Sequence, residues 1–342
     1  SELFSTAFSD ASLAPGDSIN VEFQFLSTGT ISQTVGTATV VAAGVNNVDV
    51  QLSAGYYGPV WHAAPNGDDV LGDGSGSNPF ASIQFGIDNI PYGDTLIVID
   101  GVYAENLIFN AANIIVGSLY LLDGDTSHIS ATIIDGGRNG TVVTFSQDGI
   151  SIDSTTLLSG LTLINGFGEE GGAINVMYSN PRIENMILTG NESERGGGIY
   201  FMSSNSNISN VIIRGNIANQ GSGMYLTDSN PKITYSIITN NLGWGGILLE
   251  EASSPLISNS TIYNNSNENE VGNNSLYIMQ SSNPVLINSI VGSEGEYEIF
   301  FEASGSINIS HSDVIGGEAA ISSSGMETII WGEGNIDADP QF

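Results

Sequence analysis

Three short strings decide the fold: GGAINV at residues 171–176, GGGIYF at 196–201 and GSGMYL at 221–226 recur with a period of about 25 residues. Two related strings, WGGILL (244–249) and NSLYI (274–278), continue the series, the first after a slightly shorter interval and the second after a longer one. A period of this length is the signature of a repeat architecture, in which each unit buries its apolar face against its neighbours. The sequence therefore predicts a solenoid.

Each unit carries two further signals. Short apolar runs follow Ser-Asn or Ser-Pro turns in SNPRI (179–183), SNSNI (204–208), SNPKI (229–233), SSPLI (253–257) and SNPVL (282–286). Each unit then closes with Gly190-Asn191, Gly215-Asn216, Asn240-Asn241 or Asn264-Asn265. Short β-branched runs between such turns are typical of strands, and no long stretch with the period of a helix fits between them. The units are therefore β-rich rather than helical.

Alternation within the first run of each unit predicts which side chains enter the core. The predicted inward pairs are Ile174/Val176, Ile199/Phe201, Met224/Leu226, Ile247/Leu249 and Leu276/Ile278. Stacking equivalent strands at about 4.8 Å per unit makes parallel sheets along a solenoid. We therefore expect an all-β protein, a parallel β-helix of about nine coils of about 25 residues over residues 95–315.

Asparagines fall in two columns of this stack. The first contains Asn191, Asn216, Asn241 and Asn265, and the second Asn185, Asn210, Asn259 and Asn288. Stacked amides can bond to one another and to turn backbone, and Asn tolerates the left-handed conformation that tight corners need. Both columns are expected at corners of the coil.

The two ends of the chain differ from the repeats. Residues 79–90 are expected to form a capping helix, with Asn78 as N-cap and Pro79 in the first helical position. Residues 1–58 form a separate β-rich segment, because VEFQFL (21–26), TATVVAA (37–43) and VDVQLS (48–53) read as strands. The β-helix is expected to span residues 59–342.

Composition excludes several classes of protein. The chain has 37 acidic and 5 basic residues, a net charge of −32, and no cysteine. So few cations argue against nucleic-acid binding, against attraction to anionic membranes and against a site for polyanionic sugars. No apolar run approaches the length of a membrane span, about 18 residues. Without cysteine, thiol catalysis and disulfide scaffolds are excluded.

The segments at 61–109, 133–145 (IIDGGRNGTVVTF), 159–174 (SGLTLINGFGEEGGAI) and 335–342 (NIDADPQF) resemble one known group. They are similar to secreted bacterial right-handed parallel β-helix proteins of the pectin-lyase-like superfamily. The resemblance covers about residues 60–342 and implies a right-handed coil and an extracellular location, secreted or attached to the cell surface. It does not specify an activity, because the superfamily contains pectate lyases, pectinesterases, glycosidases and adhesins. Residues 1–57 resemble the tail of an Ig-like module.

One pair of carboxylates could serve catalysis. Uronate lyases of this superfamily use calcium bound by Asp and an Arg or Lys base, and no clustered Asp set occurs in the repeats. Glycosidases instead need two carboxylates flanking the bond. Glu169 and Glu194 occupy equivalent positions on adjacent coils, with Arg195 beside them. The alternative is that Glu170 and Arg195 form a surface ion pair that offsets the neighbouring glutamates.

The loop at residues 66–74, NGDDVLGDG, concentrates carboxylates among glycines. Calcium suits oxygen-rich, flexible loops of this kind, so Asp68, Asp69 and Asp73 are candidate ligands of a structural calcium ion. The loop lacks the EF-hand spacing, and a solvated turn is the alternative. The three histidines are scattered without the spacing of zinc ligands.

The residues that alternate with the inward column are the main binding candidates. Those expected to point outward, one on each coil, are Tyr200, Tyr225, Leu248, Tyr277 and Ile299. A neighbouring outward column contains Met177, Met202, Met279 and Phe301. Monomers seldom expose a continuous apolar strip of this length. Either the chain's own segments cover it, or it binds a sugar chain or another protein.

Two functions follow from these observations. The first hypothesis is an extracellular, non-catalytic β-helix module for binding or display, with a polysaccharide or a protein surface as partner and no cofactor apart from the structural calcium. The alternative is a glycosidase or lyase acting on a neutral or weakly charged polysaccharide through Glu169, Glu194 and Arg195. The position of the two glutamates relative to Tyr200 distinguishes these hypotheses.

Overall fold

The computed structural model describes residues 4–5, 24–25, 32–40, 48–56, 59–110, 113–146, 152–266, 274–292, 297–322 and 325–340. The chain separates into two compact units, residues 1–60 and 61–342. In the first, β1 (Phe4–Ser5) pairs with β2 (Gln24–Phe25), and β3 (Ser32–Val40) with β4 (Val48–Tyr56), both antiparallel. The similarity of this segment to an Ig-like module stays a prediction.

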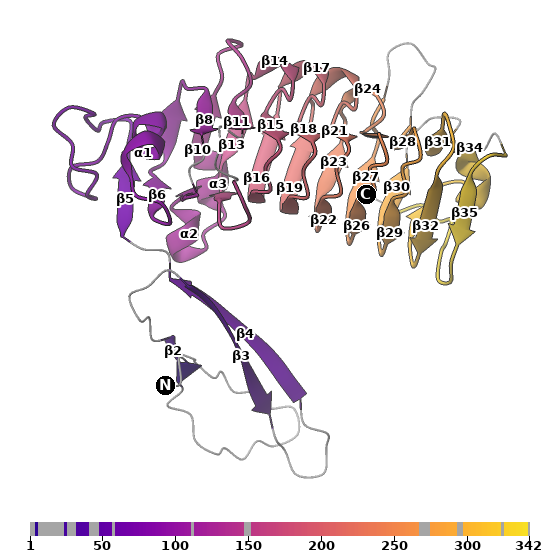
Figure 1. Cartoon of the computed structure of the whole chain (residues 1–342), viewed down its shortest axis with the longest axis horizontal. Helices are drawn as coiled ribbons and strands as arrows, with labels where there is room; N and C mark the ends of the chain where they lie inside the picture. Colours follow the sequence, from indigo (N-terminus) through magenta and orange to yellow (C-terminus); the bar gives the residue numbers. More distant parts are fainter. Residues whose placement is uncertain are drawn as a thin grey trace. The chain divides into compact units, whose positions relative to one another are not determined.

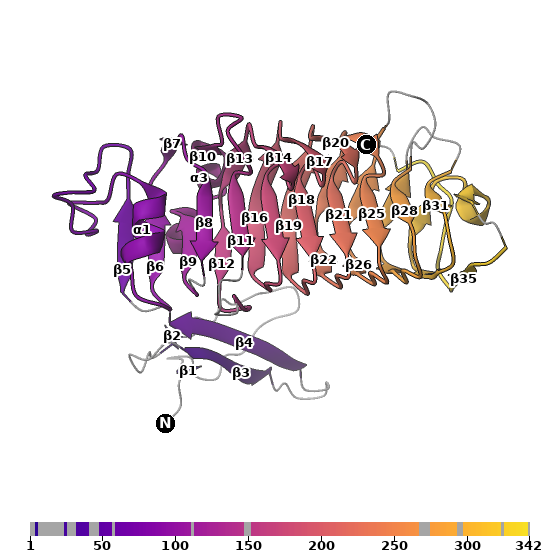
Figure 2. The same cartoon turned by 45° about the horizontal axis from the view of Figure 1, so that its top comes forward.

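The second unit is a stack of parallel strands (Figure 1). One of its sheets has nine strands, one after another along the stack, as Figure 2 shows from β8 to β31. These are β8 (Leu107–Asn110), β11 (Val143–Ser146), β15 (Ile174–Met177), β18 (Ile199–Met202), β21 (Met224–Thr227), β25 (Ile247–Glu250), β28 (Leu276–Ile278), β31 (Ile299–Phe301) and β34 (Ile321–Ser322). Every neighbouring pair in this sheet is parallel.

A second sheet of 18 strands forms two further sides of the coil. Its strands are β5 (Val60–Ala63), β6 (Thr95–Val98), β7 (Gly101–Tyr103), β9 (Ile115–Ser118), β10 (Thr132–Asp135), β12 (Leu157–Ser159), β13 (Thr162–Ile164), β16 (Arg182–Thr189), β19 (Asn207–Arg214), β22 (Lys232–Thr234), β23 (Ile237–Thr239), β26 (Leu256–Ser258), β27 (Thr261–Tyr263), β29 (Val285–Ile287), β30 (Ile290–Gly292), β32 (Ser306–Ser310), β33 (Asp313–Val314) and β35 (Thr328–Trp331). A third, four-stranded sheet consists of β14 (Phe167–Glu170), β17 (Glu192–Arg195), β20 (Ile217–Gln220) and β24 (Leu242–Trp244).

The predicted all-β parallel β-helix is confirmed. Its nine-stranded sheet has one strand on each coil, in agreement with the number of coils expected, and the N-terminal coils are longer than the coils that carry the repeat. The equivalent residues of the first three strands in the nine-stranded sheet are Leu107, Val143 and Ile174, which are widely spaced in the sequence. The central steps, from Ile174 to Ile199 and on to Met224, have the length that the repeat predicts.

The core runs along the inside of the stack. All ten residues of the predicted inward pairs are buried in one continuous hydrophobic cluster. In β31 the prediction is wrong by one residue, because Ile299 pairs with Leu276 and Phe301 with Ile278. Ile299 and Phe301 are therefore buried in the core, and Phe300 takes the outward place beside Tyr277.

The two asparagine columns have different roles. In the first, each Nδ2 donates to the Oδ1 of the next, at 2.9 Å from Asn191 to Asn216 and 3.0 Å from Asn216 to Asn241. The second column turns the corner inside the 18-stranded sheet with left-handed backbone, φ being 55° at both Asn185 and Asn210. Burial of a continuous amide ladder satisfies backbone groups that the corner would otherwise leave without partners. The prediction that both columns lie at corners is confirmed.

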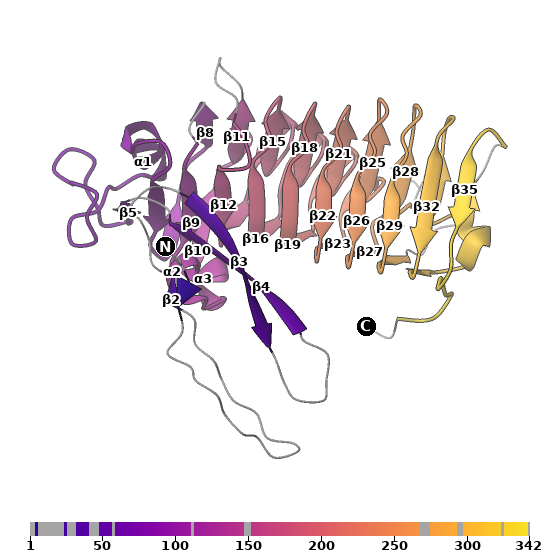
Figure 3. The same cartoon turned by 60° about the horizontal axis from the view of Figure 1, so that its bottom comes forward.

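Helices are few and short among the described residues. The capping helix α1 spans Ile83–Asn89, and its N-cap is Ser82, whose Oγ accepts from the Phe85 N–H at 3.3 Å. The expected start at Pro79 is wrong, because Asn78 instead bonds to the Leu71 carbonyl of the preceding loop. Helices α2 (Tyr120–Asp123) and α3 (Ser127–Ala131) lie against the 18-stranded sheet near β9 and β10 (Figure 3), and a 3₁₀ turn spans Gly317–Ala320. None of the described helices is long and apolar enough to span a membrane.

Candidate functional site

The nine-stranded sheet has an outer face, opposite the core, on which two columns of side chains follow the stack. The first column is Asn175, Tyr200, Tyr225, Leu248, Tyr277 and Phe300, in register from strand to strand. The second column begins with Met177, Met202, Thr227 and Glu250. Met279 and Glu302 follow the ends of the next two strands. The outward direction predicted for Tyr200, Tyr225, Leu248 and Tyr277 therefore matches the register.

The four-stranded sheet covers part of this outer face. Its residues Glu170, Arg195, Gln220 and Trp244 are aligned from strand to strand. The guanidinium carbon of Arg195 lies 5.6 Å from the ring centroid of Tyr200 and 5.8 Å from that of Tyr225. The cover leaves Tyr200, Tyr225 and Leu248 buried, whereas Tyr277, Met177, Met202 and Met279 are only partly buried. The chain's own cover thus applies to three of the candidate binding residues.

The aromatic rings stack on one another along the column. Tyr200 and Tyr225 are nearly parallel, with centroids 5.5 Å apart, and Tyr277 lies 5.1 Å from Phe300. Trp244 joins the row from the four-stranded sheet, 6.4 Å from Tyr277 and parallel to it within 11°. The faces of Tyr200 and Tyr225 are used within the protein, so neither can dock a sugar by its face. Trp244, at 46% exposure, is the most open ring of this row.

Carboxylates accompany the tyrosine hydroxyls. Tyr225 donates its hydroxyl hydrogen bond to Glu250 on the next coil, and Tyr277 donates to Glu302 at 2.8 Å. Burial, followed by the hydrogen bond to the carboxylate, raises the pKa of both tyrosines well above the usual value of 10. Both hydroxyls therefore stay protonated donors at neutral pH. Each carboxylate keeps lone pairs for further donors, since a carboxylate accepts about four hydrogen bonds.

Two polar atoms at the buried end of the outer face have no hydrogen-bond partner among the described residues: Asn175 Oδ1 and Tyr200 Oη. Burial, and then the negative charge of Glu170, raise the pKa of Tyr200 to about 12. A buried polar group without a partner costs about 1–3 kcal/mol. The polar groups at this end of the outer face therefore have fewer hydrogen-bond partners than those at the end that carries Glu250 and Glu302.

The predicted ion pair between Glu170 and Arg195 is confirmed. Arg195 Nη2 donates to Glu170 Oε1 at 2.6 Å, and the side chains of Arg195 and Glu170 are 40% and 25% exposed. Because the guanidinium also lies over two tyrosine rings, the pair is part of the cover of the outer face. The charge of Arg195 is already balanced by Glu170.

The candidate catalytic glutamates do not meet the condition for an enzyme site. Glu169 and Glu194 are both exposed and alternate with Glu170 and Arg195, so they lie on the opposite face of the four-stranded sheet from Tyr200. Glu194 accepts a hydrogen bond from the exposed Asn219. The two glutamates therefore do not lie together in a groove beside Tyr200, which was the condition for the enzyme alternative, and the catalytic assignment loses its geometric basis.

The three candidate calcium ligands, Asp68, Asp69 and Asp73, each accept hydrogen bonds that stabilise a turn or a helix cap. Asp68 Oδ1 accepts from the N–H groups of Val70 and Leu71, and Asp73 Oδ1 accepts from the N–H of Ser75. Asp69 bonds to Ser82 at the start of α1. No three metal-binding side chains come together within the described part of the chain. A structural calcium ion at this loop stays a prediction. The hydrogen bonds of the three carboxylates do not support it, because they are explained by the turns and the helix cap.

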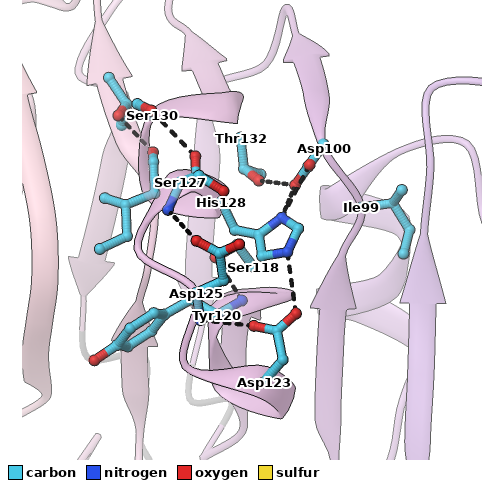
Figure 4. A network of polar contacts seen from close by, with 12 residues as sticks. Ile99, Asp100, Ser118, Tyr120, Asp123, Asp125, Ser127, His128, Ser130 and Thr132 are labelled. Carbon is cyan, nitrogen blue, oxygen red and sulfur yellow. Dashed lines mark hydrogen bonds and ion pairs between the residues drawn. The ribbon is translucent and has the colours of Figure 1, made fainter.

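One cluster escaped the sequence analysis. His128 of α3 lies between two carboxylates, with Nδ1 2.7 Å from Asp100 and Nε2 3.1 Å from Asp123 of α2 (Figure 4). Thr132 Oγ1 also donates to Asp100, at 3.2 Å. The hydrogen bond to Asp100 is the main reason why the pKa of His128 is raised. Asp100 is 28 residues before His128, so no local spacing announces the cluster.

The part of the chain that forms the outer face matches the model of one known protein family. The model of the family described as right-handed beta helix region matches residues 112–266 and 209–333, which together make up more than half of the chain. The chain belongs to the right-handed β-helix family. This match also agrees with the right-handed coil that the resemblance implied.

Solved structures similar to this β-helix include three enzymes. A pectin methylesterase in complex with a hexasaccharide is 11% identical, over 79% of this chain and 92% of that one, with a TM-score of 0.44. A pectate lyase is 14% identical over 82% and 77%, with a TM-score of 0.39, and a pectin methylesterase from carrot is 12% identical over 84% and 86%, with a TM-score of 0.40. Similarity at this level carries no argument about activity. No curated protein matches the chain.

Proposed function

We propose that this β-helix binds a neutral carbohydrate chain on the outer face of its nine-stranded sheet. The observation that carries the proposal is the open end of that face. There the half-exposed Trp244 and the partly buried Tyr277 lie beside two carboxylates, Glu250 and Glu302, that tyrosine hydroxyls hold in place.

This combination suits the chemistry of a sugar. A pyranose has an apolar face of C–H groups, which packs on aromatic rings, and a rim of hydroxyls, which donate to carboxylates. Ligand sites typically combine apolar and aromatic surface with a few well-placed polar groups. Carboxylates held by neighbouring donors are pre-organised, which lowers the entropic cost of binding.

The charges favour a neutral ligand. Glu250 and Glu302 add negative charge at the open end, and the net charge of the chain is −32. Arg195 is the nearest cation on this face, and Glu170 already pairs with it. A uronate polymer would be repelled by this field, whereas a neutral polysaccharide would not.

The proposal is binding rather than cleavage, since the two candidate catalytic glutamates are exposed on the opposite side of the four-stranded sheet. We also propose an extracellular location, secreted or at the cell surface. Its support is the resemblance to exported β-helix proteins, together with an acidic surface that keeps a protein soluble. Detection of the protein in the medium or on intact cells, against the cell lysate, tests this location.

Calorimetry on the full chain tests binding. Neutral polysaccharides and polygalacturonate are titrated into the wild-type protein and into Trp244→Ala. We expect neutral ligands alone to bind, and Trp244→Ala to weaken binding at least 10-fold, about 1.4 kcal/mol. The matched control is Tyr235→Ala, which removes an aromatic side chain that is 64% exposed at the corner between β22 and β23. The absence of binding to any glycan, or equal losses in both variants, would refute the proposal.

A reducing-end assay on the same polysaccharides separates binding from hydrolysis. We expect no release of reducing ends over hours. Release that disappears in the double variant Glu169→Gln/Glu194→Gln would reverse the assignment in favour of an enzyme.

A further inference from the structure

We infer that the helical insertion between β9 and β10, residues 119–131, is a pH-sensitive cover that protonated His128 holds closed and that opens when this ring loses its proton. The insertion contains α2 and α3, which lie against the 18-stranded sheet (Figure 3). The proposed carbohydrate site lies on the nine-stranded sheet. The cover and the carbohydrate site are therefore independent, and either can fail without the other.

The two nitrogens of the His128 ring face two different carboxylates (Figure 4). Nδ1 lies 2.7 and 2.9 Å from the two carboxylate oxygens of Asp100, and Nε2 lies 3.1 Å from Asp123 Oδ2. An ionised carboxylate only accepts hydrogen bonds, and a neutral imidazole has a single N–H. Both contacts can therefore be hydrogen bonds only when each ring nitrogen carries a proton.

Other hydrogen bonds hold both carboxylates in place. Asp123 Oδ1 accepts from the Asp125 N–H at 2.8 Å, and Asp100 Oδ1 accepts from Thr132 Oγ1 at 3.2 Å. Loss of one proton from the ring thus places a nitrogen lone pair against a carboxylate that cannot donate. The shorter contact, which involves both oxygens of Asp100, keeps the remaining N–H. The contact with Asp123 of α2 is the one that is lost.

The other groups around the insertion do not replace this contact. Asp125, in the turn between α2 and α3, adds a third negative charge near the ring. Among the strands packed against α3, β10 contributes the hydroxyl of Thr132 and β13 that of Thr162, neither of which titrates. On β16, Arg182 and Glu184 pair with each other at 3.4 Å. The charge on the imidazole is therefore the one that balances these carboxylates.

The direction of the pKa shift agrees with this geometry. The hydrogen bond to Asp100 is the main cause that raises the pKa of His128. The closed form is therefore favoured fully below the ordinary histidine pKa of 6.5, and the preference is lost as pH rises through the higher pKa of the folded state. The cover opens on the alkaline side.

The insertion depends on polar contacts because it buries little apolar surface. None of the described residues 119–131 is buried. Thr162 Oγ1 donates to the Ile129 carbonyl at 2.7 Å, which is a further bond between the insertion and the coils. Tyr120 Oη donates to Asn185 at 3.4 Å. Segments with few buried apolar contacts open locally at a small cost in free energy.

Opening changes the surface that the protein presents. Ser118 and Thr162 bond to the insertion and are buried in the closed form, and Ser159 beside them is buried as well. The surface under the cover thus carries hydroxyl groups, whereas the hydrophobic core lies inside the coils. The insertion can therefore open while the rest of the solenoid stays folded.

Amide hydrogen exchange, followed by mass spectrometry on the full chain, tests the cover. Rates for peptides spanning residues 119–131 are divided by the intrinsic exchange rate at each pH, which gives the ratio of open to closed form. We expect this ratio to rise at least about 3-fold from pH 6 to pH 9, as for the loss of an exposed charge pair. Peptides that contain β21 are the internal reference and should show no such rise.

Three variants separate the His128 contacts from other titrations. Asp123→Asn supplies a side chain that can donate to the neutral ring and accept from the protonated one, so the ratio should change by less than about 1.5-fold. His128→Asn removes the titrating ring and should also abolish the rise. Asp125→Asn is the matched control, because it removes the same charge from the same turn without a bond to the ring, and it should keep the rise. Circular dichroism at pH 6 and pH 9 confirms that each variant is folded.

Imidazole ¹⁵N spectra report the protons on the ring directly. The chain has three histidines, and the signals lost in His128→Asn identify those of His128. Both ring nitrogens should be protonated at pH 6, and Nδ1 alone at pH 9. A single protonated nitrogen at pH 6, no rise in opening in the wild type, or an equal rise in Asp123→Asn would overturn the inference.

Discussion

The two faces of the nine-stranded sheet contain alternate residues of the same strands, yet they follow different rules. On the inner face, each coil places an aliphatic or aromatic residue at the same position, from Ile174 to Ile299, and all are buried. On the outer face, the corresponding column changes from Asn175 to tyrosine, leucine and phenylalanine. The inner face needs only close packing, whereas the outer face must also satisfy hydroxyls, carboxylates and a cover.

This difference shows where variation within a repeat has functional meaning. Any apolar residue of suitable size can fill a position in the inner column. The regular pattern of this column therefore reflects the packing that stabilises the fold and carries no information about binding. The outer column varies because its residues interact with different partners, namely Arg195, Trp244 and the carboxylates of the next coil. Changes to the inner face should therefore alter stability, and changes to the outer face should mainly alter binding.

The largest expected effect is on the inner face. Phe201→Ala removes a ring that is fully buried in the core, and the cavity should lower the free energy of unfolding by about 3–5 kcal/mol. Chemical denaturation monitored by circular dichroism measures the change. A loss below about 1 kcal/mol would contradict the close packing inferred for this face.

The polar ladder inside the coil should rank next. Asn216→Ala removes the acceptor of the Asn191 N–H and of one Nδ2 hydrogen of Asn191, and it removes the side-chain donor to the Leu188 carbonyl. Each buried unpaired group costs about 1–3 kcal/mol. The same denaturation experiment measures the loss. Asn219→Ala, at an exposed position, is the control, and a cost equal to that of Asn216→Ala would show that the ladder adds nothing.

A pair of matched substitutions compares two hydroxyls on the outer face. Tyr225→Phe removes the donor to Glu250 and should lower the free energy of unfolding by about 1 kcal/mol. Tyr200→Phe removes a buried hydroxyl that has no partner among the described residues, so stability should stay constant or rise. Equal losses in both variants would mean that Tyr200 is satisfied in solution, for example by a bound water molecule.

The smallest effect should come from His128, which lies outside both faces. Its raised pKa means that folding favours the protonated ring. The stabilisation is therefore complete below the ordinary histidine pKa of 6.5 and is lost as pH rises through the higher pKa of the folded state. The difference in the free energy of unfolding between wild type and His128→Asn, measured from pH 5 to 9, should shrink as pH rises. A difference that grows as pH rises would show that folding lowers the pKa of His128 instead of raising it.

Much of the fold could be predicted from the sequence, because the repeat places equivalent residues one above another. The inward pairs, the two asparagine columns and the ion pair of Arg195 all follow from that alignment. The slip at Ile299 could not be predicted, since its coil has none of the marker strings by which the earlier coils were aligned. Similarly, Asn78 has the features of an N-cap, but its bond to Leu71 is a tertiary contact that local propensity does not contain.

The candidate site was predicted less completely. Alternation identified the outward columns, and cover by the chain's own segments was one of the alternatives. Strands such as β17 and β20 fall in segments that read as turns, so the four-stranded sheet that provides the cover was not expected. The cluster around His128 depends on residues brought together only by the winding of the chain. Alignment of the repeats shows which residues of successive coils lie next to one another. It does not show which residues on different sides of the same coil come into contact.

The unequal coil lengths have an evolutionary consequence. The step from Leu107 to its equivalent Val143 is much longer than the step from Ile299 to Ile321, while the strands stay in parallel register at both ends. The solenoid therefore accommodates insertions at its corners without disturbing its ladders. Helices α2 and α3 lie in the longer of these two steps. A descendant of this protein could lengthen the corner beside the outer face in the same way and acquire a new specificity on an unchanged rod.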